Sequence, residues 1–86
     1  MIKRLDSLTK NFYENAMTQF KHFLLNGETY IIYQDISLFD LLKYFDYNDS
    51  LLVLEYNNLI CEKKKWKTIF IQDSDLIEIV TIVGGG

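Results

Sequence analysis

The dipeptide Asn26-Gly27 constrains the fold of this chain more than any other feature, because it separates two apolar-rich runs, KHFLL and ETYIIY. Asparagine and glycine both accept the positive φ of a type I′ turn, and Asn-Gly between such runs is the strongest short hairpin signal. We therefore expect two antiparallel strands, at about 20–25 and 28–34.

The stretch SLFDLLKYFD, which follows this hairpin, predicts a helix over about 37–46. Ser37 supplies a capping hydroxyl, and Asp40 three residues later completes a pattern similar to a capping box. The apolar residues at positions i, i+3, i+4 and i+7 form one stripe: Leu38, Leu41, Leu42 and Phe45. This stripe is expected to face the core.

The rest of the chain reads as strands joined by turns. We expect strands in LLVLEY (51–56), at about 68–71 and at 76–83, with a solvated loop at 62–67 that contains a half-buried Trp66. A single helix must then cover one face of the sheet, because its apolar stripe and the inward-facing strand residues can be buried only against each other. The predicted class is α+β, a β-grasp fold with one main helix on a mixed sheet of four to five strands.

The segment 1–19 stands apart from this domain, which we place at 20–86. Its apolar residues have loose helical spacing, but the stretch is polar and lacks a strong cap. A weak helix and a disordered arm both remain open for it.

Composition excludes several classes of function. The 86 residues carry a formal net charge of −3, which argues against a nucleic-acid partner, and no run approaches the apolar length of a membrane span. Cys61 and His22 are single residues of their types, so the sequence offers no disulfide framework, no metal site and no supported catalytic pair. A reducing compartment is expected.

The sequence ends in IVGGG, so three of its four glycines are Gly84, Gly85 and Gly86. Glycine loses more conformational freedom on ordering than any other residue, so such a run stabilises nothing. A frayed end would explain it, and so would a terminus that is itself the working part.

Over residues 22–86 the chain resembles the ThiS family of sulfur carriers, which are ubiquitin-like β-grasp proteins of thiamine biosynthesis. The stretches LLNGETY, SLFDLLKYF and LVLEYNNLI carry generic β-grasp patterning, whereas DSDLIEIVTIVGGG is similar to the specific ending of the family. Where the family usually has Gly-Asp in the turn, this chain has Ser74-Asp75, a departure expected to alter only turn geometry. The biased composition is similar to that of versions encoded in algal plastids.

The resemblance implies that the protein is a cosubstrate rather than an enzyme, with no catalytic residues, bound cofactor or metal of its own. A ThiF-like adenylating enzyme would use ATP and Mg²⁺ to activate the Gly86 carboxylate, with Gly84 and Gly85 threaded into its active site. Sulfur from a cysteine desulfurase would form a thiocarboxylate, which a ThiG-like thiazole synthase would consume. The protein alone would be a monomer, in the chloroplast stroma if plastid-encoded and otherwise in bacterial cytoplasm.

Val80 and Ile82 are the candidate docking residues. If Ile77 and Ile79 point to the helix, then Val80 and Ile82 point to the opposite face, where they either contact a partner or pack under the N-terminal segment.

Three other functions remain open at this point. The small subunit of molybdopterin synthase shares the fold and the Gly-Gly end, although it usually has Pro before the glycines and this chain has no Pro. The other two are a ubiquitin-like protein modifier and a β-grasp binding module.

Overall fold

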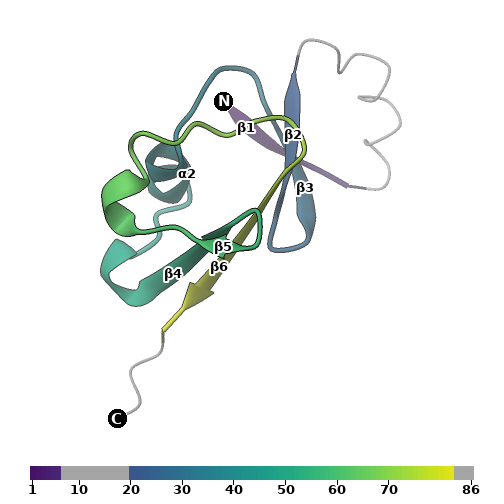
Figure 1. The fold of residues 1–86 in the computed structure, drawn as a ribbon. Helices are drawn as coiled ribbons and strands as arrows, with labels where there is room; N and C mark the ends of the chain where they lie inside the picture. The colour runs from purple at the N-terminus through teal and green to yellow at the C-terminus, as the bar shows by residue number, and fades with distance from the viewer. Residues whose placement is uncertain (7–19, 83–86) are drawn as a thin grey trace.

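The computed structural model describes residues 1–6 and 20–82. Within these ranges the chain forms a six-stranded sheet and a single α-helix, with two short 3-10 helices in the connections (Figure 1). The elements, in chain order, are β1 (Ile2–Leu5), β2 (Lys21–Leu25), β3 (Glu28–Ile32), α2 (Leu38–Tyr44), η2 (Asp49–Leu51), β4 (Leu52–Tyr56), β5 (Leu59–Ile60), η3 (Lys63–Lys65) and β6 (Asp75–Thr81).

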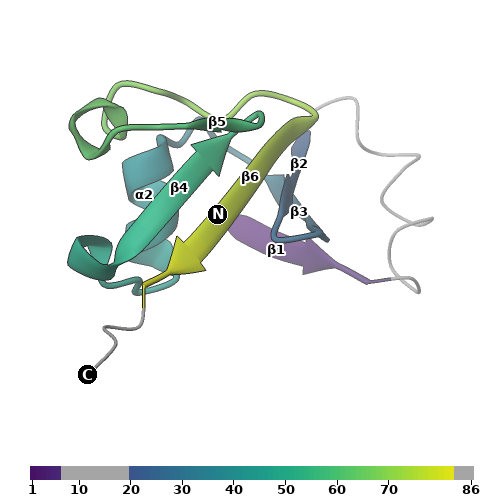
Figure 2. The same cartoon turned by 60° about the horizontal axis from the view of Figure 1, so that its bottom comes forward.

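The sheet is mixed and has the order β1-β3-β2-β6-β4-β5. β2 and β6 are parallel, and the other neighbouring strands are antiparallel. The helix α2 lies across one face of this sheet (Figure 2). The predicted α+β class and β-grasp arrangement are confirmed, with six strands in place of the four to five expected.

β1 corrects one sequence-based prediction. We expected a weak helix or a disordered arm over 1–19, but Ile2–Leu5 is a strand that pairs antiparallel with β3. Ile2 and Leu5 are buried while the two residues between them are exposed, so β1 lacks strand alternation, and its i, i+3 spacing matches a helical pattern better than a strand. Residues 7–19 lie outside the described part of the chain.

The hairpin turn predicted at Asn26-Gly27 forms, and a similar turn joins β4 and β5. Asn26 and Gly27 have φ values of 49° and 81°, which is the left-handed region that a type I′ turn requires. Asn57 and Asn58, with φ of 52° and 71°, make the equivalent turn between β4 and β5. Asparagine tolerates this region better than other residues with a Cβ atom.

The capping box and the apolar stripe define α2. The Ser37 hydroxyl accepts a hydrogen bond from the Asp40 amide, and the Asp40 carboxylate accepts one from the Ser37 amide. The helix packs its stripe against the inward residues of the central strands. The completely buried core side chains, with 0% exposure, include Phe23, Leu38, Leu41, Leu54, Ile71 and Ile77.

The segment between β5 and β6 differs from the prediction. No strand forms at 68–71, where Phe70 makes an isolated bridge to Ser37. Trp66 is 3% exposed rather than half-buried, and its Nε1 donates to the Cys61 carbonyl at 3.0 Å. The predicted loop at 62–67 contains a 3-10 turn, Lys63–Lys65, whose three lysines are exposed as expected.

Candidate functional site

β6 leads to the C-terminal glycines and occupies the middle of the sheet. It pairs with β2 on one side (Leu25 with Ile77) and with β4 on the other (Leu52 with Thr81). Ile77 and Ile79 are buried and Glu78 is exposed, as the alternation predicts. The strand is therefore fixed along both edges and by its inner face.

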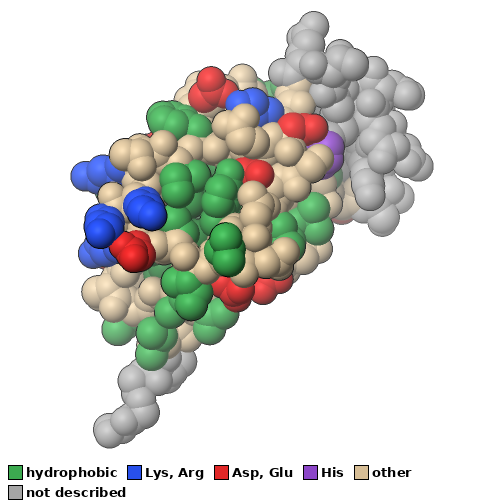
Figure 3. Space-filling model, viewed as in Figure 1, with side chains coloured by type: hydrophobic (Ala, Val, Ile, Leu, Met, Phe, Trp, Pro, Cys, Tyr) green, Lys and Arg blue, Asp and Glu red, His purple; other side chains and the backbone are tan. Residues whose placement is uncertain are grey.

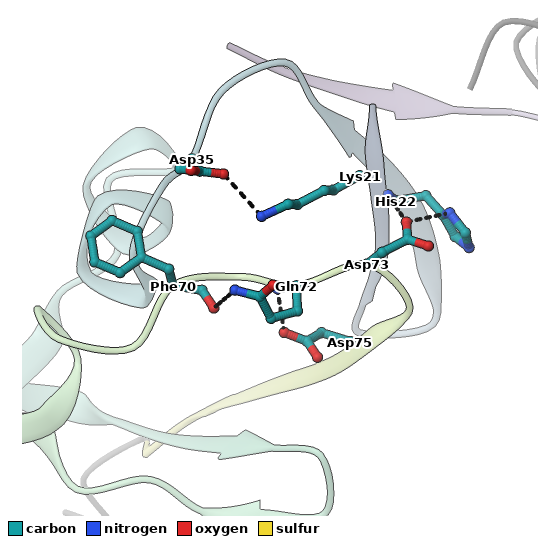
Figure 4. Close-up of polar contacts among 7 residues, drawn as sticks. All are labelled: Lys21, His22, Asp35, Phe70, Gln72, Asp73 and Asp75. Atoms are coloured by element: carbon teal, nitrogen blue, oxygen red, sulfur yellow. Dashed lines mark hydrogen bonds and ion pairs between the residues drawn. The ribbon is translucent and has the colours of Figure 1, made fainter. Parts of the chain in front are cut away.

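The turn that enters β6 is held to β2 by polar contacts (Figure 4). The Asp73 carboxylate accepts a hydrogen bond from the His22 amide and lies 2.9 Å from His22 Nδ1. The Ser74 amide donates to the His22 carbonyl at 2.7 Å, and the Ser74 hydroxyl lies 3.4 Å from His22 Nε2. Ser74 has a φ of 69°, a region that favours glycine, and glycine is what the resemblance leads one to expect in this turn.

Asp75 begins β6 with a buried carboxylate that accepts three hydrogen bonds. Its donors are the Gln72 amide at 2.7 Å, Asn57 Nδ2 at 3.1 Å and the Tyr56 hydroxyl at 2.5 Å. Burial, together with this bond to Asp75, raises the pKa of Tyr56 to about 12. Because a buried carboxylate needs such donors, Asp75 ties the turn, β4 and β6 together.

The carboxyl end of β6 is open to solvent. The Ile82 amide donates to the Leu51 carbonyl at 2.6 Å, which extends the pairing with β4 one residue beyond the strand. Val80 is 55% exposed and Ile82 52% exposed, so neither side chain is buried beneath another of the described segments. Their docking role stays a prediction. The predicted reactive residues Gly84, Gly85 and Gly86 lie outside the described residues.

The single cysteine and the metal-ligating side chains offer little chemistry of their own. Cys61 is half-buried, and burial raises the pKa of its thiol, which lowers the fraction of reactive thiolate. Within residues 1–6 and 20–82, no group of three His, Cys, Asp or Glu side chains could hold a metal ion. No helix in these ranges is long and apolar enough to cross a membrane.

With β6 and its surroundings placed, comparison with known families decides the relationship. The model of the ThiS family matches residues 23–86, from β2 through the last glycine. The chain belongs to the ThiS family. This match covers every described element except β1 and the first residues of β2.

Relatives and a solved structure agree with membership of the ThiS family. The protein ycf40 of Trieres chinensis is 62% identical over 66 residues, which is 77% of this chain and 90% of that protein. Its counterpart in Porphyra purpurea is 37% identical over 62 residues, 72% of this chain and 87% of that protein. A crystal structure of a thiamine biosynthesis protein (ThiS) from Geobacter metallireducens matches with a TM-score of 0.66 at 19% identity, covering 76% of this chain and 99% of that one.

ThiS family members are small ubiquitin-like sulfur carriers and not enzymes themselves. The prediction of a ThiS-like β-grasp carrier is therefore confirmed at the level of family and fold. The predicted exposure of Val80 and Ile82 is confirmed, whereas the role assigned to the glycines stays a prediction. Sequence reasoning missed the anchoring role of the Asp75 carboxylate. This role depends on hydrogen bonds from Tyr56 and Asn57, which lie 19 and 18 residues earlier in the chain.

Proposed function

We propose that this chain carries sulfur on the carboxyl group of Gly86 and delivers it for the thiazole moiety of thiamine. The observation that carries the proposal is the family match, which continues through the glycine run to Gly86. The similarity of the fold to a protein named for thiamine biosynthesis agrees with this assignment.

The physical properties of a glycine end suit this role. Three residues reach at most about 10–11 Å when extended, far enough to enter a cleft while the sheet stays outside. Without Cβ atoms, Gly84, Gly85 and Gly86 can pass a narrow channel and adopt the backbone angles that an active site requires. Gly86 would supply only the reacting carboxyl group.

The chemistry requires partner enzymes. A C-terminal carboxylate has a pKa near 3.3–3.7, so at neutral pH it is an anion and a poor acyl donor. A ThiF-like enzyme would transfer AMP from Mg-ATP to this carboxylate and release pyrophosphate. A sulfur nucleophile supplied through a cysteine desulfurase would then displace AMP to give the thiocarboxylate, which a ThiG-like thiazole synthase would consume.

The expected location follows from the relatives. The proteins named ycf40 are encoded in plastid genomes, which supports a plastid location for this chain. We place its function in the stroma, where we expect it to be a monomer between encounters with its partners.

The deciding experiment is the intact mass of the protein after incubation with ATP, a cysteine desulfurase and a ThiF-like enzyme. We expect a gain equal to the exchange of one oxygen for one sulfur, located by peptide mass at Gly86. A chain that ends at Gly85 should fold normally and gain nothing, because its shortened terminus no longer places a carboxylate at the position of the Gly86 carboxylate. The absence of a gain in the complete chain, with an active enzyme mixture, would overturn the proposal.

The same samples separate the alternatives. A protein modifier would appear as conjugates to lysines of other proteins, and a binding module would keep its function without Gly86. A carrier for molybdopterin synthesis would be loaded equally well but would pass its sulfur to a different acceptor, so a thiazole-forming assay distinguishes it.

A further inference from the structure

The face of the sheet opposite α2 carries an exposed apolar surface near the end of β6. Leu54 and Ile79 face the core, so their neighbours Val53 and Val80, which pair across β4 and β6, face outward. Ile60 of β5 shares this face because it pairs with Glu55. We call Val53, Ile60, Val80 and Ile82 the outer apolar patch. Figure 3 shows hydrophobic side chains over β5 and toward the carboxyl end of β6.

Two carboxylates interrupt this patch. Glu55 of β4 and Glu78 of β6 are directly paired in the antiparallel ladder, next to Val53 and Val80. Side chains paired in this way have Cβ atoms about 4.5–5.5 Å apart, and like charges at such positions destabilise a sheet.

Neither carboxylate is neutralised within the described chain. Ion pairs within the described residues occupy other acidic side chains, among them Asp35 with Lys21 and Asp49 with Lys63, but none reaches Glu55 or Glu78. The negative charge on this face is therefore available to a partner.

We propose that the outer apolar patch docks the adenylating enzyme through an arginine of that enzyme, inserted between Glu55 and Glu78 and surrounded by apolar side chains. A guanidinium has five donors in a planar fork, so one side chain can bond both carboxylates. This inference rests on the proposed function, since it names the surface that would bring the glycine end to its activating enzyme.

The same charges argue against a second copy of this chain as the occupant. Two identical faces packed together would bring four carboxylates into one interface without a cation. Like charges brought together in this way oppose association. A basic partner, in contrast, relieves the repulsion between Glu55 and Glu78 that the free protein carries.

The test compares the double variant Glu55→Gln and Glu78→Gln with the unchanged protein in the mass-gain assay. The control is Asp35→Asn with Asp46→Asn, which removes two negative charges from exposed residues away from the patch and also breaks the exposed ion pair between Asp35 and Lys21. We expect the apparent KM of the adenylating enzyme for this protein to be on the order of tenfold higher for the Glu variant. The control variant should leave this KM unchanged. Added salt should weaken docking of the unchanged protein more than that of the Glu variant.

Thermal unfolding provides the second readout. The Glu variant should unfold at the same temperature as the unchanged protein or higher, because two repelling charges are gone. Equal KM values for both proteins, or a lower unfolding temperature in the Glu variant, would overturn this inference alone. Failure to load the unchanged protein would overturn the proposed function and this inference together.

Discussion

At its amino end, β6 is held by Asp73, Ser74 and Asp75 through hydrogen bonds to β2, β4 and the preceding turn, whereas at its carboxyl end Val80 and Ile82 are more than half exposed. One strand thus joins a polar anchor to an open apolar surface. The contacts that stabilise the fold thus lie at one end of β6, and the proposed docking surface lies at the other end. Changes at the two ends should therefore have separable effects.

Asp75→Ala should destabilise the fold more than any other single change at either end of β6. It leaves the Tyr56 hydroxyl, Asn57 Nδ2 and the Gln72 amide without their acceptor, and we expect a loss of about 3 kcal/mol in the free energy of unfolding. Urea unfolding measures it. At the other end, Ile82→Ser should change this free energy by less than about 0.5 kcal/mol. A loss at Ile82 as large as that at Asp75 would break the comparison.

Tyr56→Phe tests the same anchor more mildly, with an expected loss of about 1 kcal/mol at neutral pH because one hydrogen bond disappears. Its pH dependence is more informative. The folded pKa of Tyr56 is about 12 against an ordinary value of 10.0, so this residue stabilises the fold fully below pH 10. That stabilisation is lost as the pH rises through 12.

Urea unfolding of the unchanged protein and the Tyr56→Phe variant at several pH values in this range isolates the effect from other titrating groups. The gap between the two proteins should shrink as the pH rises. If the difference in unfolding free energy between the two proteins does not change with pH, Tyr56 has the same pKa in the folded and unfolded states, which would contradict this prediction.

Ser74→Gly should have the smallest effect of the three changes at the amino end of β6, and the opposite sign. Ser74 adopts a φ of 69°, which costs a residue with a Cβ atom roughly 1–2 kcal/mol and costs glycine little. The variant loses the hydroxyl contact to His22, so a net gain of about 0.5 kcal/mol is expected in thermal or urea unfolding. Ser74→Ala, which keeps the strain and loses the contact, is the matched control and should destabilise.

Local signals predicted much of the fold. The hairpin at Asn26-Gly27 and the helix after Ser37 follow from turn and capping chemistry that acts over a few residues. The exposure of Val80 and Ile82 follows from strand alternation. These signals suffice because each depends on residues close together in the chain.

Features that depend on distant partners could not be predicted. β1 is a four-residue edge strand whose only strand neighbour within the described residues is β3, and its sequence IKRL has no alternation. The apolar run at 68–71 resembles a strand but is bound by loop contacts, such as the Ile71 amide to the Ile36 carbonyl at 3.0 Å. The pairing of Glu55 with Glu78 likewise requires the register between β4 and β6.

The sheet order has a consequence for how the protein is made. β6 follows every other described strand in the chain, yet it lies between β2 and β4. Without it, the sheet separates into the pieces β1-β3-β2 and β4-β5. A nascent chain still lacking β6 cannot close its core, so the ribosome must finish this strand before the sheet can assemble. A chain that is truncated before β6 therefore cannot assemble the complete sheet.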